Sequence, residues 1–213
     1  MTAFLITKPS NTPFAHFILA HGAGAPMDTP FMNTIAEGLA EKGILVSRFE
    51  FPYMALRRDD GKRRGPGSAT KLLDFYRNIV KENAGDLPLF IGGKSMGGRI
   101  ASMIADETGL TGVICLGYPF HPPGKPEKLR TAHLEVMQLP TLIVQGERDP
   151  FGKPEEVADY TLSSLLKIFW IPDGDHSFKP RKKSGHTEEE NIQMAIDAAS
   201  EFILNTAKSK EKN

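Results

Sequence analysis

Short apolar runs alternate with segments of helical periodicity along almost the whole chain. The runs are rich in β-branched and aromatic residues and have the length of buried strands, while the segments between them repeat apolar residues every three to four positions. This alternation is typical of a parallel sheet with helices on both faces. We therefore predict an α/β fold with one doubly wound, mostly parallel sheet of about six to seven strands flanked by helices. The predicted strands are 15–20, 44–51, 87–92, 112–116, 142–145 and 167–171.

Two of the predicted helices have clear start signals. Thr29 has the position of an N-cap and Pro30 that of the first helical residue, in a helix that Gly43 ends. Thr187 and Glu190 have the spacing of a capping box at the start of the final helix. These signals place helix starts directly after turns, as an alternating α/β fold requires.

The length of 213 residues fits one domain with little room for a second. At this size a chain buries enough surface to be stable without a disulfide or a metal. We divide it into a domain over residues 1–207 and a polar tail over 208–213, and we expect residues 53–67, which are rich in Arg and Gly, to form a loop.

Charge and cysteine content exclude several classes of protein. The 26 Lys and Arg residues balance the 26 Asp and Glu residues, which disfavours a general nucleic-acid binder. Cys115 is the only cysteine, so an intramolecular disulfide and a cysteine-based zinc cluster are excluded, and a reducing compartment is indicated. The N-terminus has no signal-peptide pattern, and no apolar run reaches the roughly 20 residues of a membrane span. We expect a cytoplasmic protein without membrane contact, and the sequence does not indicate an oligomeric state.

The segment Gly93-Lys94-Ser95-Met96-Gly97 is a G-x-S-x-G motif that lies directly between a predicted buried strand and a helix. So sharp a turn strains the residue at its apex and crowds the backbone two positions away, which only glycine tolerates. The geometry exposes the Ser95 hydroxyl above the sheet edge and makes it a candidate nucleophile, with the Met96 N–H beside it as an oxyanion donor. The alternative is a glycine-rich turn with an N-capping serine.

Two nucleotide-binding motifs overlap these glycine-rich segments and fail on spacing. A phosphate-binding loop requires glycine where this chain has Pro88, and a dinucleotide-binding fingerprint requires glycine where it has Met27. We therefore predict no cofactor and no metal.

A nucleophilic serine needs a histidine base, and that histidine needs a carboxylate to orient it. Asp149 directly follows the predicted strand 142–145, and His176 follows the predicted strand 167–171. The carboxyl ends of parallel strands meet at one edge of a sheet, so Ser95, Asp149 and His176 are expected to meet there. The alternative makes Asp149 a loop-capping residue and His176 a surface histidine.

Other residues compete for the same roles. The histidines His121, His133 and His186 follow other elements of the chain, and His21 is expected to brace its own loop by hydrogen bonding. Glu147, Asp173 and Asp175 remain alternatives to Asp149 as the acid.

The short loop His21-Gly22-Ala23-Gly24 follows the first strong strand and can supply a second oxyanion donor. We assign this donor to the Ala23 N–H, with Gly24 as the alternative.

Four segments together resemble the α/β-hydrolase superfamily and, within it, the small dienelactone-hydrolase-like family. They are HGAG at 21–24, GKSMGGR at 93–99, GYPFHPPG at 117–124 and GDHSF at 174–178. The resemblance covers nearly the whole chain and implies an α/β-hydrolase fold, with Ser95, Asp149 and His176 as a catalytic triad. Dienelactone hydrolases themselves use cysteine where this chain has Ser95, so their substrate cannot be transferred. A relative within a nuclear histone-acetylating complex acts as a scaffold, so the family does not guarantee catalysis.

We therefore expect a serine hydrolase that cleaves small carboxylic esters or related acyl compounds through an acyl-enzyme, or alternatively a non-catalytic binding or scaffold module with the same fold. About two dozen residues separate the predicted strands 112–116 and 142–145, which leaves room for a minimal cap or none. Basic residues in two loops near the predicted triad suggest a rim that attracts an anionic substrate. The alternative is that these charges are solvated and partly neutralised by Asp59 and Asp60. The rim residues are Arg57, Arg58, Arg63 and Lys179.

Overall fold

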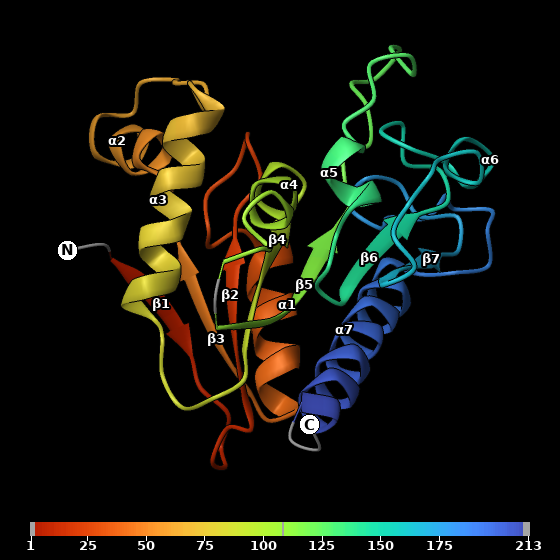
Figure 1. Ribbon diagram of the computed structural model, residues 1–213. Helices are drawn as coiled ribbons and strands as arrows, with labels where there is room; N and C mark the ends of the chain where they lie inside the picture. The colour runs from red at the N-terminus through yellow and green to blue at the C-terminus, as the bar shows by residue number, and fades with distance from the viewer. Residues whose placement is uncertain (1–2, 108, 211–213) are drawn as a thin grey trace.

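One seven-stranded sheet forms the centre of the computed structural model, which describes residues 3–107 and 109–210. The strand order is β1-β3-β2-β4-β5-β6-β7, and only β1 (Phe4–Thr7) runs antiparallel to its neighbour β3 (Ile44–Phe49). The predicted doubly wound, mostly parallel α/β sheet is therefore confirmed (Figure 1). The remaining strands are β2 (Ala15–Ala20), β4 (Leu89–Lys94), β5 (Leu110–Leu116), β6 (Thr141–Gly146) and β7 (Leu166–Ile171).

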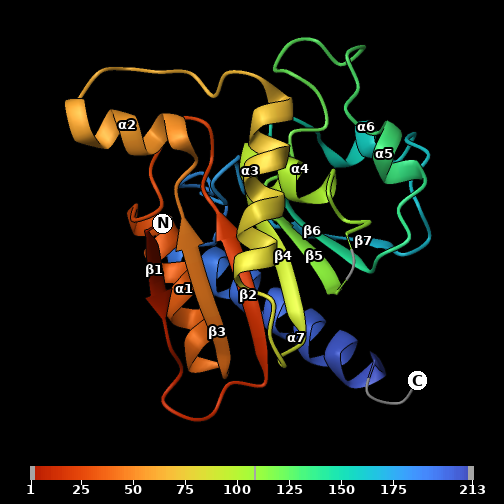
Figure 2. The ribbon, with the colours of Figure 1, turned by 60° about the vertical axis from the view of Figure 1, so that its left-hand side comes forward.

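Helices cover both faces of the sheet (Figures 1 and 2). Alternate residues of β2 belong to different hydrophobic clusters: Phe17 packs with α1 (Pro30–Glu41) and α7 (Glu188–Lys210), and Ile18 packs with α3 (Ala69–Glu82) and α4 (Met96–Ser102). This follows from the two-residue period of a strand, which sends neighbouring side chains to opposite faces. Because both faces are covered, the strands are almost uninterruptedly apolar.

The predicted helix starts are present. Thr29 Oγ1 accepts a hydrogen bond from the Met32 N–H at 3.3 Å. At the start of α7, Thr187 Oγ1 accepts from the Glu190 N–H at 3.1 Å, and Glu190 Oε2 accepts from the Thr187 N–H at 2.8 Å. Helix α7 includes residues 208–210 of the predicted tail, and Lys210 Nζ donates to the Leu110 carbonyl at 3.2 Å. Residues 211–213 lie outside the described part of the chain.

Two elements differ from the sequence expectation. Part of the expected loop 53–67 is the helix α2 (Pro52–Asp60), which has Pro52 in its first turn and Gly61 in the left-handed conformation at its end. Tyr53 and Met54 are its only buried residues, too few to give an apolar periodicity. The strand β1 was not expected, because its central residues are exposed at the sheet edge and its apolar pattern does not alternate.

The polypeptide between β5 and β6 contains one short helix in its described residues, α5 (Ala132–Glu135), and α6 (Pro154–Val157) follows β6. The carboxyl ends of β2 to β7 lie along one edge of the sheet because these strands are parallel. Loops at this edge carry the residues that the sequence singled out. No helix in the described ranges combines the length and apolarity needed to cross a lipid bilayer.

Candidate active site

Ser95 lies at a strained turn between β4 and α4. Its backbone angles are φ 51° and ψ −114°, a conformation that non-glycine residues rarely adopt. The turn is tightly packed: a Cβ atom on Gly93 would lie 2.5 Å from the Ala20 carbonyl oxygen, and one on Gly97 would lie 2.6 Å from that of His21. Both glycines are therefore required for the turn to approach β2. Strain of this kind costs about 1–3 kcal/mol and is typical of functional sites.

His176 and Asp149 form a hydrogen-bonded pair. His176 Nδ1 lies 2.8 Å from Asp149 Oδ2, and the Asp149 side chain is completely buried. The carboxylate also accepts hydrogen bonds from Gln145 Nε2 at 3.0 Å and from the Phe151 N–H at 2.9 Å. An ionised carboxylate only accepts hydrogen bonds, so the proton of a neutral His176 ring lies on Nδ1 and the lone pair on Nε2.

Ser95 and His176 line the same hollow, which has a volume of about 480 Å³. We call it the His176 hollow; Phe31, Met32 and Phe151 form much of its apolar wall. The Phe151 ring packs on the imidazole with a centroid distance of 4.4 Å. The described residues contain no hydrogen bond between the Ser95 hydroxyl and His176. In many enzymes the hydrogen bond between nucleophile and base tightens only when substrate binds.

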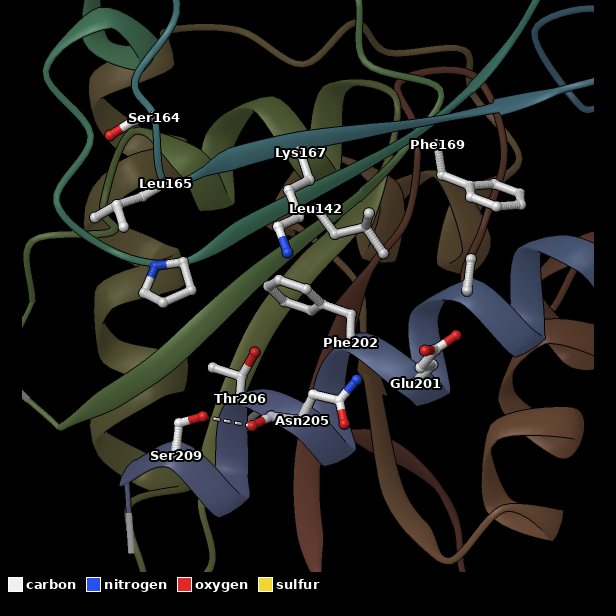
Figure 3. Close-up of a pocket in the computed structure, with 12 residues that line it drawn as sticks. Leu142, Ser164, Leu165, Lys167, Phe169, Glu201, Phe202, Asn205, Thr206 and Ser209 are labelled. Carbon is white, nitrogen blue, oxygen red and sulfur yellow. Dashed lines mark hydrogen bonds between the residues drawn. The ribbon is translucent and has the colours of Figure 1, made fainter. Parts of the chain in front are cut away.

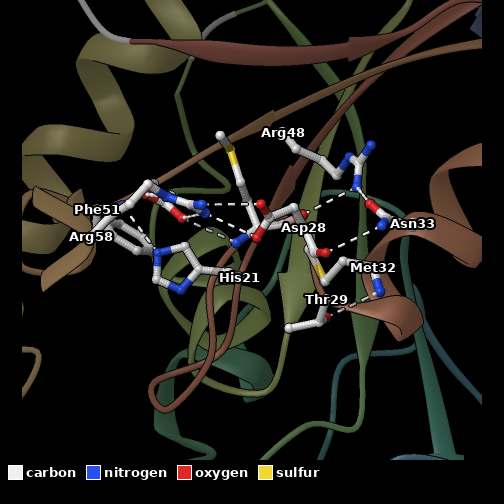
Figure 4. Close-up of polar contacts among 10 residues, drawn as sticks. His21, Asp28, Thr29, Met32, Asn33, Arg48, Phe51 and Arg58 are labelled. Carbon is white, nitrogen blue, oxygen red and sulfur yellow. Dashed lines mark hydrogen bonds and ion pairs between the residues drawn. The ribbon is translucent and has the colours of Figure 1, made fainter. Parts of the chain in front are cut away.

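The loop 21–24 is held by side chains that bind its carbonyl groups. His21 Nδ1 contacts the Gly22 carbonyl at 2.6 Å. The Phe51 N–H donates to His21 Nε2 at 3.1 Å (Figure 4), so the ring carries its proton on Nδ1. Tyr53 donates its hydroxyl proton to the Ala23 carbonyl at 3.0 Å, and Arg57 donates to that of Gly24 at 3.1 Å. His21 thus braces its loop, as the sequence suggested.

This bracing fixes the direction of the Ala23 N–H. In a trans peptide the carbonyl and the following N–H point in opposite directions. The Gly22 carbonyl points toward His21, so the Ala23 N–H points away from it. Ala23 lines the His176 hollow together with Ser95. Met96 is the first residue of α4, and the first N–H groups of a helix have no partner within the helix. Both N–H groups are therefore candidates to bind an oxyanion.

Lys94 is a site residue that the sequence analysis did not identify. Its ammonium group donates to the His176 carbonyl and lies 5.6 Å from the Phe31 ring centroid. A Cβ atom at residue 117 would lie 2.7 Å from Lys94 Nζ, so Gly117 leaves space for this side chain. Lys94 joins the end of β4 to the loop that carries His176. The sequence shows that Lys94 lies within the G-x-S-x-G motif, but no sequence pattern predicts that its side chain contacts residue 176.

The titration of Lys94 leads to a stability prediction. Burial lowers its pKa from 10.5 to about 8, against an opposing effect of the Asp149 and Asp175 carboxylates. Between these two values the unfolded chain binds a proton that the folded chain does not, so the free energy of unfolding should rise with pH. Each pKa unit corresponds to about 1.4 kcal/mol, so the contribution should reach about 3 kcal/mol. Lys94→Met should abolish it.

Urea unfolding of both proteins at several values from pH 7.5 to 10.5 measures the difference. Lys183→Met removes an exposed lysine and is the matched control. Parallel stability curves for the wild type and Lys94→Met would contradict the prediction.

Of the four basic rim residues, two are paired with acidic side chains. Arg58 binds Asp28 at 2.9 Å and also Glu50 (Figure 4), and Lys179 binds Glu188 at 3.0 Å. Arg57 holds the Gly24 carbonyl, as described above. Arg63 is exposed and lines a shallow hollow of about 370 Å³ that also contacts Ala23 and Gly24.

The other histidines occupy different surroundings. His16 Nε2 lies 2.8 Å from Ser47 Oγ, and His133 Nε2 lies 2.9 Å from Ser102 Oγ. Neither serine has the positive φ angle of Ser95, and both are buried within a strand or a helix. His121 Nδ1 contacts the Pro122 carbonyl at 2.9 Å, and its other ring nitrogen lies 3.5 Å from Glu156. Ser95 is therefore the only serine of the described chain that combines the strained turn with a histidine-lined hollow.

Another hollow of about 460 Å³ lies between α7 and strands β6 and β7 (Figure 3). Its lining includes Leu142, Phe169 and Phe202, with Lys167 and Glu201 at its border. None of the residues that the sequence predicted for catalysis lies there. The chemistry-bearing residues gather instead around the His176 hollow.

Comparison with known proteins supports the α/β-hydrolase fold. Residues 13–204 match the family described as "Alpha/beta hydrolase domain". A dienelactone hydrolase from Anabaena variabilis is similar in structure, with a TM-score of 0.72 and 20% identity over 95% of this chain and 90% of that one. A serine hydrolase without lid from Xanthomonas campestris has a TM-score of 0.68 and 19% identity over 95% and 87% of the two chains. The protein Est1E from Butyrivibrio proteoclasticus has a TM-score of 0.67 and 16% identity over 95% and 93%.

Proposed function

Because the chain belongs to the α/β-hydrolase superfamily and has a dienelactone-hydrolase-like fold, we propose that it is a serine hydrolase of small carboxylic esters or related acyl compounds. The observation that carries this proposal is the strained Ser95 turn, which opens into the same hollow as His176 while Asp149 holds the far side of the imidazole. A structural turn has no need of a strained, non-glycine apex with these neighbours.

The reaction begins with attack of Ser95 Oγ on the carbonyl carbon of the substrate, and His176 Nε2 takes the hydroxyl proton. The Met96 and Ala23 N–H groups stabilise the negative charge on the carbonyl oxygen of the tetrahedral intermediate. The intermediate then collapses, and the bond to the leaving group breaks as His176 returns the proton to it. An acyl-enzyme remains on Ser95. Water repeats the sequence, releases the carboxylic acid and restores the serine.

Asp149 supports both halves of this cycle. Its carboxylate holds His176 in the tautomer that presents a lone pair on Nε2, and it stabilises the imidazolium that forms when the proton is taken up. Three hydrogen bonds to the buried carboxylate, from Gln145, Phe151 and His176, keep its position fixed.

The names of similar proteins support an acyl substrate and an open site. Structures with this fold include a "serine hydrolase without lid" and an "Esterase domain" from Rhodothermus marinus. The short α5 helix between β5 and β6 is consistent with a site that no cap covers.

Labelling with a fluorophosphonate probe tests the proposal. The probe reacts with activated serines, so the folded protein should acquire one adduct, which peptide mass spectrometry should place on Ser95. His176→Ala should abolish the adduct because the serine loses its base. His186→Ala removes a histidine from an exposed loop and is the matched control. Absence of an adduct on Ser95 in folded protein would favour a scaffold that retains the fold without catalysis.

A further inference from the structure

A second hollow, with a volume of about 310 Å³, begins at Ser95 on another side of the nucleophile. We call it the Arg99–Arg130 hollow, after the two charged residues that line it. Ser95 and Met96 line it, and Leu72 and Ile100 contribute apolar surface. None of the described acidic side chains lines it. An apolar hollow with a few convergent polar groups is the usual form of a small-molecule site.

Neither guanidinium group has a partner among the described residues. In residues 3–107 and 109–210, no Asp or Glu carboxylate lies within 4.0 Å of either arginine, and Arg99 Nε is buried without a hydrogen bond. Across these same ranges they are the only partly buried arginines whose side chains form neither an ion pair nor a hydrogen bond. Five other arginines have carboxylate partners: Arg58, Arg64, Arg77, Arg148 and Arg181.

The like charges of Arg99 and Arg130 oppose one another. Burial lowers the pKa of the Arg130 guanidinium, and the charge of Arg99 lowers it further. Burial and Arg99 also lower the pKa of the neighbouring His133 to about 4, against an opposing effect of the Asp106 carboxylate, so that this ring is neutral near pH 7. Two half-buried cations without a carboxylate at ion-pair distance are unfavourable in the free protein, and an anionic ligand would relieve this.

The backbone of Arg130 is fixed in advance. Its N–H donates to the Phe120 carbonyl at 2.8 Å, and its carbonyl accepts the Tyr118 hydroxyl at 2.8 Å. Arg99 is held by helix α4, where its N–H donates to the Ser95 carbonyl at 3.0 Å. The two backbones therefore need no ordering when a ligand binds, and only the two side chains remain to be fixed.

The position of the hollow indicates which part of the substrate it would receive. The leaving group must take its proton from His176, so it lies in the His176 hollow. The carbonyl oxygen points toward the Met96 and Ala23 N–H groups. The acyl chain takes the remaining direction. The Arg99–Arg130 hollow shares Ala23, Ser95 and Phe151 with the His176 hollow, but His176 does not line it.

We propose that the Arg99–Arg130 hollow binds a carboxylate at the far end of the acyl chain, which makes the preferred substrates esters or thioesters of short dicarboxylic acids. This inference rests on the proposed function, because it uses Ser95 as the reacting group. Arginine suits the role, since its planar fork donates two parallel hydrogen bonds to a carboxylate.

Two chromogenic esters with the same leaving group and the same number of acyl carbons test the proposal. Mono-4-nitrophenyl adipate carries the terminal carboxylate, and 4-nitrophenyl hexanoate does not. We expect kcat/KM to be at least 10-fold higher for the adipate ester. Arg130→Gln and Arg99→Gln should each lower kcat/KM for the adipate ester roughly 10- to 100-fold, because each removes a charge-assisted hydrogen bond. Activity on the hexanoate ester should stay within about 3-fold, since the neutral chain makes no such bond.

Lys81→Gln is the matched control, since it removes one positive charge at an exposed residue of α3 that does not line this hollow. It should leave the ratio of the two kcat/KM values unchanged. Equal kcat/KM values for the two esters in the wild type, or an equal loss in Lys81→Gln and Arg130→Gln, would overturn the proposal, because the preference would then be absent or would come from the overall charge of the protein.

A calorimetric titration with adipate and hexanoate separates this inference from the proposed function. If neither ester is hydrolysed, the hydrolase proposal fails, and the binding of adipate alone then tests whether the Arg99–Arg130 hollow is a carboxylate site. Binding of adipate that Arg130→Gln abolishes would support the site, and absence of adipate binding to the wild type would overturn it. Melting temperatures of all variants show whether a loss reflects unfolding.

Discussion

Replacing Ser95 by Ala should lower kcat for ester hydrolysis by about 10⁴- to 10⁶-fold, the range seen when a serine nucleophile is removed from such a unit. The acyl-enzyme cannot form without Oγ. A residual rate above that in water should remain, because Met96, Ala23 and the hollows still bind and polarise the substrate. Steady-state hydrolysis of 4-nitrophenyl hexanoate and of the adipate ester measures the change. Loss of fluorophosphonate labelling should accompany it.

The Ser95→Ala variant should also be at least as stable as the wild type. Its apex residue keeps the unfavourable φ angle but loses only a hydroxyl that makes no hydrogen bond within the described residues. A matched control is Ser102→Ala, which removes a hydroxyl of α4 that lies 2.9 Å from His133 Nε2. It should retain most of the activity. If Ser95→Ala hydrolysed these esters at the wild-type rate, the nucleophile would have to be assigned to another residue.

Replacing Asp149 by Asn should lower kcat by about 10⁴-fold, the loss known for this change in a serine protease triad. Asp149 Oδ2 accepts from both His176 and Gln145, and Oδ1 accepts from the Phe151 N–H. An amide offers one oxygen and one NH₂ group. With NH₂ toward His176, the ring must present a lone pair on Nδ1 and carry its proton on Nε2, where it cannot accept the proton of Ser95. With NH₂ toward Phe151, two donors face one another in a buried site.

Three further variants test the choice of acid. Glu147→Gln, Asp173→Asn and Asp175→Asn make the same carboxylate-to-amide change at residues that the sequence left as alternatives. Asp173 binds Arg181 and Arg148, Asp175 caps the turn at 177–179, and Glu147 accepts from the Asp173 N–H. None of these carboxylates hydrogen-bonds to the His176 ring in the described chain, so each variant should keep kcat within about 10-fold. A loss as large as that of Asp149→Asn at any of them would move the acid to that residue.

The sequence predicts most of the sheet because buried parallel strands are nearly continuous apolar runs, which stand out between polar turns. Ala15–Ala20 and Leu110–Leu116 are buried along their whole length. The edge strand β1 has exposed central residues, and α2 buries only Tyr53 and Met54, so neither leaves a periodic pattern. The order of elements was therefore predictable, but the short elements at the border of the sheet were not.

Some residues of the candidate site could likewise be predicted from the sequence, and others could not. Residues that lie directly after strands could be predicted to meet, since parallel strands bring their carboxyl ends to one edge. Ser95 and His176 do share a hollow, and Asp149 lies behind the imidazole. Residues that act through a side chain reaching across the fold could not be predicted. Lys94 contacts the carbonyl of residue 176, and Arg99 and Arg130 converge from segments about 30 residues apart.

The short segment between β5 and β6 has a kinetic consequence. Enzymes with a mobile lid often turn over at the rate at which the lid opens, which hides changes in the chemical steps. The described part of this chain has only the four-residue helix α5 at that place. On the proposed function, a substrate would enter and a product would leave without a rearrangement of the fold. Turnover should then be limited by acylation or deacylation, so the rate changes of the variants above report the barriers of bond making and breaking at Ser95.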